Sequence, residues 1–191
     1  KFFNKKHLKS SSKFNSILGG HPEFGKVPGV EASTGALGHG PAIGVGMAIA
    51  AKLNKQKYKT FAIVGDGEIN EGSFWESSMI ASKHKLNNFH VIIDYNKIQS
   101  YGKTKEVLDL EPLQKKLETF GYNVSEVNGH NVKQLTRYFQ KIKNNKNKPT
   151  ALICHTIKGK GFPFAENNPY WHHKNFFTDQ EVKNINQCLQ K

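Results

Sequence analysis

Two largely apolar runs of strand length, each followed by a polar turn, constrain the fold of this chain most strongly. The runs are Lys59–Val64 and Phe89–Asp94, and such runs are typical of strands covered on both faces of a parallel sheet. Between them, Ser73–Leu86 carries its apolar residues at helical spacing. A strand, a helix and a second strand in this order predict a right-handed crossover that sets the two strands side by side.

The alternation of strand and helix continues along the rest of the chain. Capping pairs mark two helix starts, Asn131 with Gln134 and Thr178 with Glu181, and Gly121 follows the expected end of another helix. Further helices are expected over Pro41–Leu53, Leu110–Phe120 and Asn131–Asn144, and further strands over Tyr122–Val127 and Pro149–Ile157. The pattern predicts the α/β class, a three-layer α/β/α fold with a mainly parallel sheet.

The length of 191 residues suits one core, so residues 1–191 are expected to form a single domain. Residues 1–20 have a loop-like composition. Neither of the two cysteines has metal-ligand spacing, and both are interpreted as reduced. No stretch approaches the roughly 20 apolar residues of a membrane span, and no signal segment opens the chain. A cytoplasmic protein without a membrane partner is the expectation.

The chain is strongly basic, with 28 lysines and arginines against 15 aspartates and glutamates and a net charge of +13. Such a charge can indicate a nucleic-acid partner, because phosphates attract clustered lysines. Here the lysines are spread along the chain, and the densest run, Lys141–Lys148, lies where a helix is expected to end and cations complement the helix dipole. The sequence therefore favours a solvated basic surface, and nucleic acid is not expected as a partner.

Polar residues with ligand chemistry follow the two central strands. Gly65-Asp66-Gly67-Glu68 comes after the first strand and Asn96 after the second, 30 positions beyond Asp66. Ligands of open parallel sheets bind beyond the carboxyl ends of the strands, where these two turns would meet. One carboxylate with amide and carbonyl oxygens suits Mg²⁺ or Ca²⁺, and Mg²⁺ commonly completes its shell with phosphates. A Gly-Asp-Gly alone is more often a plain turn, but the paired Asn96 favours a metal and diphosphate site.

The segment GDGEINEGSFWE followed by IIDYNKIQ resembles the thiamine diphosphate motif of the transketolase family. Three further segments match that family in order, namely HPEF from His21, GVEASTGALGHG from Gly29 and KGKGFPFAENNPYWH from Lys158. The resemblance covers Gly20 to His172 and is closest to forms in which the enzyme is divided between two polypeptides. Two positions depart from the family, with His39 in place of the usual glutamine and His173 in place of the usual glycine.

The resemblance implies a role for each matching residue. Asp66, Asn96 and the carbonyl of Ile98 would bind the metal, and His21 and His172 would be catalytic. Glu71 would lie at an interface between subunits, between two cofactors. The remaining cofactor-binding positions would be Gly35, Ala36, Leu37, Gly65, Gly67 and Glu68, with His172 also near the diphosphate.

The resemblance also implies a function, transfer of two-carbon ketol units between sugars or sugar phosphates with thiamine diphosphate and Mg²⁺. In the family a separate pyrimidine-binding domain supplies a glutamate to the cofactor, and no such second domain is found in residues 1–191. We therefore expect a transferase that is inactive as an isolated chain and works with a pyrimidine-binding polypeptide, in a heterotetramer built by self-association. Alternatives are a part of a 1-deoxyxylulose-phosphate synthase or a 2-oxo acid enzyme, or a non-catalytic remnant serving as a basic binding module.

Overall fold

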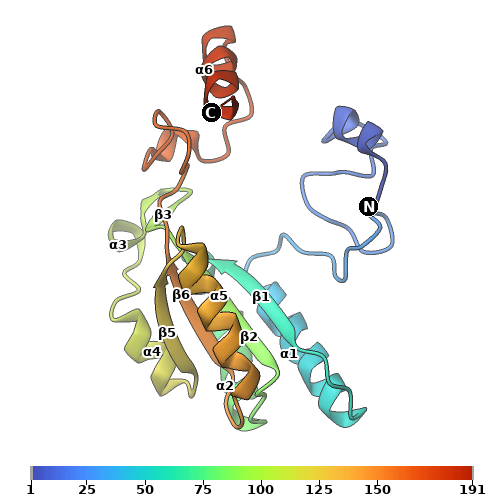
Figure 1. Cartoon of the computed structure of the whole chain (residues 1–191), viewed down its shortest axis with the longest axis vertical. Helices are drawn as coiled ribbons and strands as arrows, with labels where there is room; N and C mark the ends of the chain where they lie inside the picture. The colour runs from blue at the N-terminus through green and yellow to red at the C-terminus, as the bar shows by residue number, and fades with distance from the viewer. Residues whose placement is uncertain (1, 191) are drawn as a thin grey trace.

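The computed structural model describes residues 2–190 and contains a four-stranded, fully parallel sheet in the order β1-β2-β6-β5 (Figure 1). The strands are β1 (Thr60–Gly65), β2 (Phe89–Tyr95), β5 (Asn123–Asn128) and β6 (Thr150–His155). The last strand in the sequence, β6, lies between β2 and β5. A small antiparallel hairpin, β3 (Ile98–Gln99) with β4 (Gly102–Lys103), follows β2 at the carboxyl end of the sheet.

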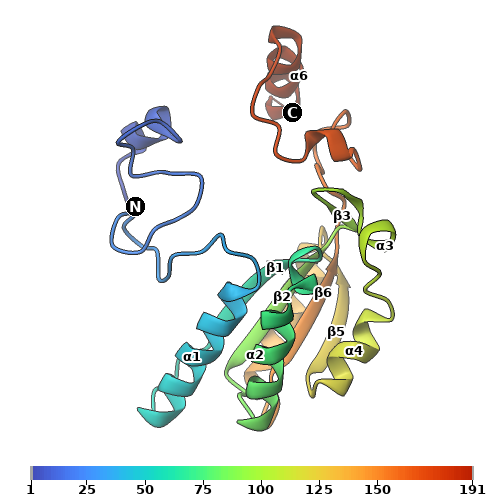
Figure 2. The same ribbon diagram turned by 180° about the vertical axis from the view of Figure 1, so that it is seen from behind.

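Helices cover both faces of the sheet, which confirms the predicted α/β class. Three helices lie on one face, in front of the strands in Figure 2, and one lies on the other face. The first three are α1 (His39–Leu53), α2 (Gly72–Lys83) and α4 (Leu113–Thr119), and the fourth is α5 (Val132–Lys141). The short α3 (Thr104–Val107) follows the hairpin, and α6 (Asp179–Leu189) ends the described chain beyond the sheet. Lys5–Ser10, Glu68–Asn70, Ile142–Asn144 and Pro169–Trp171 are short 3-10 helices.

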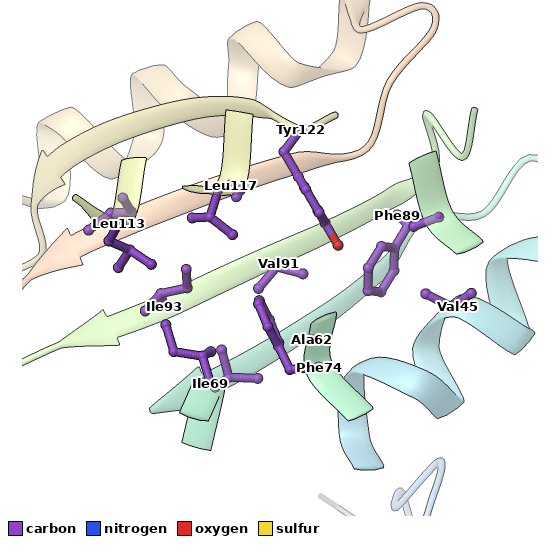
Figure 3. Close-up of a cluster of buried hydrophobic side chains, with 14 of the residues drawn as sticks. Val45, Ala62, Ile69, Phe74, Phe89, Val91, Ile93, Leu113, Leu117 and Tyr122 are labelled. Carbon is purple, nitrogen blue, oxygen red and sulfur yellow. The ribbon is translucent and has the colours of Figure 1, made fainter. Parts of the chain in front are cut away.

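The main core lies between the sheet and the three helices (Figure 3). Phe74 of α2 and Leu117 of α4 pack with Phe89, Val91 and Ile93 of β2, and all five side chains are essentially inaccessible to solvent. Burying a large apolar side chain contributes about 1.5–3 kcal/mol, so this cluster fixes β2 firmly beneath α2 and α4. The turn that follows β2 is therefore held on a rigid support.

The register of β1 and β2 places the two polar turns at the same edge of the sheet. Gly65 pairs with Asp94, so the residues that follow each strand begin at the same level. The backbone N–H of Asp66 donates to the carbonyl of Asp94 at 3.3 Å. The predicted strand–helix–strand crossover is confirmed.

The start of α4 and the capping of α5 differ from the sequence prediction. Pro112 adopts an extended conformation, and the Glu111 side chain accepts from the N–H of Leu113, so the helix expected from Leu110 begins at Leu113. At the start of α5, Asn131 accepts from the N–H of Gln134 as expected, but the Gln134 side chain accepts from the N–H of Asn128. The capping box is thus half formed there, because the turn before the helix offers a different donor.

The capping box of α6 is complete. Thr178 and Glu181 exchange side-chain and backbone hydrogen bonds, as the sequence predicts. Residues 11–38 contain no helix or strand, while Lys5–Ser10 forms a 3-10 helix within the segment 1–20 that was expected to be loop-like. Within residues 2–190, none of the helices combines the length and apolar character that a bilayer crossing requires.

Candidate functional site at the carboxyl edge of the sheet

Asp66 is the centre of the candidate site. Its side chain is 1% exposed, although it carries a carboxylate. One carboxylate oxygen accepts from the N–H of Gly67 at 2.8 Å and the other accepts from the N–H of Lys97. Burial raises the pKa of Asp66 above its ordinary value, and these two hydrogen bonds offset part of that rise. A cation bound here would favour the ionised carboxylate and relieve the cost of burying it.

Asn96 lies beside Asp66 at the end of β2, with 9% of its surface exposed. Its side-chain oxygen accepts from the N–H of Ile98 at 3.0 Å, and its amide nitrogen donates to Asp94 at 3.2 Å. Lys97 adopts a left-handed conformation, with φ 68°, and its N–H donates to Asp66. The two strand ends are therefore joined by a direct hydrogen bond, in agreement with the 30-residue spacing.

The donor set at this edge fits a hard divalent cation. Each oxygen of Asp66 and the side-chain oxygen of Asn96 accepts one N–H and keeps a second lone pair. With the carbonyl of Ile98, predicted as a further ligand, these atoms would give a set of oxygen ligands with one negative charge, which suits Mg²⁺ completed by phosphate oxygens. Within residues 2–190 no group of three or more His, Cys, Asp and Glu side chains is arranged to hold a metal, so a cation here would depend on neutral oxygens.

Glu68 connects this edge to the glycine-rich segment before α1. One carboxylate oxygen accepts from the N–H of Gly38 at 3.0 Å and the other from the N–H of Gly65 at 3.3 Å. A Cβ on Gly38 would lie 2.7 Å from the Cβ of Glu71, so only glycine fits against that side chain. Ala36 and Leu37, which come just before, are exposed. The structure thus brings the predicted loop to the Gly-Asp-Gly turn and leaves Glu71 on the surface beside it.

His21 lies against the same glycine-rich segment. A Cβ on Gly35 would lie 2.5 Å from the Cγ of the His21 ring, and Gly35 has φ +132°, which side chains rarely adopt. The N–H of Thr34 donates to the carbonyl of Pro22 at 3.4 Å and holds the two segments together. His39, the first departure from the family pattern, has its Nδ1 at 3.1 Å from the carbonyl of Leu37, which can accept a hydrogen bond from it.

His172 lies beside the hairpin that begins at Ile98. Its Nε2 is 3.1 Å from the hydroxyl of Ser100, which belongs to that hairpin. Its Nδ1 is buried and has no hydrogen-bond partner within residues 2–190. Burial, with Lys158 and His173 nearby, lowers the pKa of His172, so the neutral ring is favoured. His173, at the family's glycine position, has φ 55° in the left-handed region that glycine adopts most easily.

The predicted residues therefore fall into groups that approach the sheet edge with Asp66 and Asn96 from two directions. The N-terminal segment with His21 and the C-terminal segment with His172 lie apart in both ribbon views (Figures 1 and 2). A hollow of about 340 Å³ between the N-terminal segment and β1 is lined by Pro22 and Ile63, and neither Asp66 nor Asn96 lines it. The sheet edge with Asp66 and Asn96 lies outside that hollow.

Sequence reasoning missed three residues of this edge. Ser100 holds His172, and Asp94 accepts hydrogen bonds from Asn96 and from the hydroxyl of Thr156. Asp94 stands in the strand end IIDYN and could have been found as a second carboxylate beside Asn96. The contact with Thr156 depends on the sheet order, which local patterns do not reveal.

Comparisons with known proteins identify the family of the chain. A family profile described as "Transketolase, thiamine diphosphate binding domain" matches residues 3–190. The chain belongs to this family. It is 45% identical over 172 residues to a protein of Phocaeicola vulgatus named as one subunit of an apulose-4-phosphate transketolase, an alignment that covers 90% of this chain and 61% of that protein. It is 36% identical over 151 residues to "6-deoxy-6-sulfo-D-fructose transketolase subunit SqwG" of a Clostridium species, covering 79% of this chain and 55% of that protein.

The fold agrees with solved transketolases. The crystal structure of transketolase from Campylobacter jejuni superposes with a TM-score of 0.82 at 32% identity, covering 86% of this chain and 27% of that one. The transketolase resemblance inferred from the four motifs is therefore confirmed. The chain spans about 61% of the Phocaeicola protein and about 55% of the Clostridium protein, so it corresponds to part of their length.

Proposed function

We propose that this chain is the diphosphate- and metal-binding part of a transketolase-type enzyme that transfers two-carbon ketol units between sugars or sugar phosphates. The observation that carries the proposal is the buried Asp66 carboxylate, joined to the turn after β2 through the N–H of Lys97. A plain Gly-Asp-Gly turn has no need to bury a carboxylate, which is costly unless the charge is used or paired. Two hydrogen bonds together with a bound cation would compensate the cost of burying the Asp66 carboxylate.

The proposed metal and diphosphate ligands are assigned from the polar atoms at this edge of the sheet. Asp66, Asn96 and the carbonyl of Ile98 would hold Mg²⁺, or Ca²⁺ in its place, and Gly65, Gly67 and Glu68 would line the diphosphate. When bound, thiamine diphosphate supplies the carbon nucleophile and the electron sink for cleaving a ketose carbon–carbon bond. The protein's part is to bind the cofactor and orient it.

The two histidines are proposed for charge and proton handling around the reacting carbon. His172 has a lowered pKa and an Nδ1 without a partner in the described chain, so a neutral ring can accept or donate a proton at that atom. His21 is exposed and packs against Gly35, where Gly35, Ala36 and Leu37 would contact the aminopyrimidine side of the cofactor. Both would contact substrate only when the N- and C-terminal segments approach the same bound cofactor.

A second chain is proposed to complete the site. Glu71 is exposed beside the glycine-rich segment, as are Ala36 and Leu37 within it. The relatives from Phocaeicola and Clostridium are named as subunits of transketolases. We propose that the partner is a pyrimidine-binding polypeptide, that two such pairs associate into a heterotetramer through the region of Glu71, and that this chain alone gives no turnover.

Reconstitution tests the proposed function. The chain is mixed with its candidate pyrimidine-binding partner, thiamine diphosphate and Mg²⁺, and ketol transfer from a ketose phosphate to an aldose phosphate is followed. We expect transfer only when both chains are present, and loss of transfer with Asp66→Ala. Full activity of the chain alone would contradict the divided enzyme. Cofactor binding without ketol transfer to any aldose would favour another thiamine diphosphate reaction, and a complex that binds no cofactor would favour a non-catalytic remnant.

A further inference from the structure

The proposed function gives no role to Asp94, a carboxylate at the sheet edge that carries Asp66 and Asn96, called here the metal edge. We infer that Asp94 is a positioning residue: its carboxylate fixes the orientation of the Asn96 amide and ties the segment after β6 to the metal edge. The inference rests on the proposed function, because it concerns how the same edge presents its oxygens to a cation.

Asp94 accepts a side-chain hydrogen bond at each of its carboxylate oxygens. Oδ2 accepts from the amide nitrogen of Asn96 at 3.2 Å, and Oδ1 accepts from the hydroxyl of Thr156. Asn96 lies two positions after Asp94 in the sequence, whereas Thr156 lies 62 positions after it, directly beyond β6. The carboxylate therefore joins a proposed metal ligand to a separate strand end.

The contacts of Asn96 with Asp94 and with Ile98 together decide which end of the amide faces the cation site. The oxygen and the nitrogen of an asparagine amide have nearly the same shape, but an ionised carboxylate can only accept hydrogen bonds. The nitrogen must therefore face Asp94, and the oxygen faces the N–H of Ile98, which donates to it at 3.0 Å. Without Asp94, only the N–H of Ile98 would oppose the half turn of the side chain that points an NH₂ group at the metal.

The contact with Thr156 holds the segment after β6 at the same edge. The N–H of Thr156 also donates to the carbonyl of Tyr95 at 3.4 Å, so side chain and backbone together hold this residue beside the end of β2. The chain continues from Thr156 through Lys158 to His172. Asp94 thus links the proposed metal ligands to the segment that carries His172.

Groups that orient metal ligands typically change metal affinity by roughly 10–100-fold when they are removed. We expect Asp94→Ala to weaken Mg²⁺ binding within that range and Asp94→Asn to weaken it less, since asparagine keeps one accepting oxygen. Thr156→Val should weaken binding by a smaller factor because the Asn96 contact remains. The double variant Asp94→Ala/Thr156→Val should bind Mg²⁺ no more weakly than Asp94→Ala.

The measurement is titration calorimetry of Mg²⁺ into the chain and its pyrimidine-binding partner, saturated with thiamine diphosphate. Glu118→Ala is the matched control, because it removes an exposed carboxylate near the end of α4 whose partner is Gln114. Unfolding temperatures measured without metal should stay well above the temperature of the titration, so that weaker binding does not reflect unfolding. If Asp94→Ala does not fold, Asp94→Asn and Thr156→Val carry the test.

Three outcomes separate the possibilities. Reduced Mg²⁺ affinity in Asp94 variants with unchanged folding supports the inference. The inference is overturned if Asp94→Ala binds Mg²⁺ with wild-type affinity. It is also overturned if the losses of affinity from Asp94→Ala and Thr156→Val multiply in the double variant as independent effects do. Either result leaves the proposed function unaffected. A wild-type complex that binds no Mg²⁺ contradicts the proposed function and the inference together.

Discussion

Glu68 accepts a hydrogen bond from the backbone N–H of Gly38 across 30 positions of sequence, at 3.0 Å. Its second oxygen accepts from the N–H of Gly65 at 3.3 Å, so one side chain holds the glycine-rich segment against the Gly-Asp-Gly turn. Two proposed cofactor-binding segments therefore depend on one carboxylate. This dependence leads to the first prediction.

Replacing Glu68 by alanine should loosen the glycine-rich segment. Hydrogen bonds to charged groups each contribute about 1.5–3 kcal/mol to stability. Because Glu68 is partly exposed, we expect Glu68→Ala to lower the free energy of unfolding by about 1–3 kcal/mol in total. Hydrogen exchange should show faster exchange at Gly35–Gly38 in Glu68→Ala. Glu76→Ala, which removes an exposed carboxylate on α2, is the control and should leave that exchange unchanged. Unchanged exchange in both variants would contradict the bridging role.

The left-handed conformation of Lys97 gives the second prediction. A non-glycine residue in this region costs about 1–2 kcal/mol, and its φ of 68° accompanies the backbone bond to Asp66. Lys97→Gly should raise the free energy of unfolding by up to about 1 kcal/mol, because part of the relief is offset by the greater freedom of glycine in the unfolded chain. Chemical denaturation measures the change.

Lys103→Gly is the matched comparison for Lys97→Gly. Lys103 is extended, with φ −70° and ψ 138°, so glycine there removes no strain and should lower the free energy of unfolding by about 0.5 kcal/mol. Equal effects of the two substitutions would show that the conformation of Lys97 is not strained.

The third prediction concerns acid sensitivity of the core. His90 is fully buried on β2, with Nδ1 at 2.6 Å from the hydroxyl of Thr150 and its ring stacked on Phe61. Burial, reinforced by the charge of Lys59, lowers the pKa of His90 to about 4. In the unfolded chain the histidine has its ordinary pKa of about 6.5. The free energy of unfolding therefore keeps its full value above about pH 6.5 and falls as the pH is lowered from about 6.5 to about 4. The expected loss is about 3 kcal/mol.

Denaturation curves over the range in which His90 titrates in the unfolded chain, from about pH 7.5 to about 4.5, test its role. His90→Gln, which cannot titrate, should flatten the pH dependence across this range. His84→Gln, at an exposed position, should retain the wild-type slope. The same slope in the His90→Gln variant would assign the acid sensitivity to other groups.

Local patterns predicted most of the fold correctly. The apolar runs before Gly65 and Asn96, the glycine after α4 and the capping pair of Thr178 and Glu181 all carry their information within a few residues, so strands and helix ends could be predicted directly. The predicted start of α4 at Leu110 was wrong, because the Glu111 side chain caps Leu113 and Pro112 stays extended.

Contacts that depend on sheet order could not be predicted in the same way. Local signals do not reveal that β6 lies between β2 and β5, and only that order places Thr156 beside Asp94. The contact between His172 and Ser100 likewise depends on the path of a long loop. The roles assigned to His21, His172 and Glu71 from the family resemblance stay predictions.

The central claim is that Asp66 and Asn96 hold a metal ion that anchors thiamine diphosphate. Titration calorimetry of thiamine diphosphate, with and without Mg²⁺, into the complex of this chain and its pyrimidine-binding partner tests the claim most directly. We predict Mg²⁺-dependent binding that is lost in Asp66→Ala and strongly weakened in Asn96→Ala, while Glu118→Ala binds as the wild type does. Binding of equal strength without Mg²⁺, or undiminished binding by Asp66→Ala, would contradict the account.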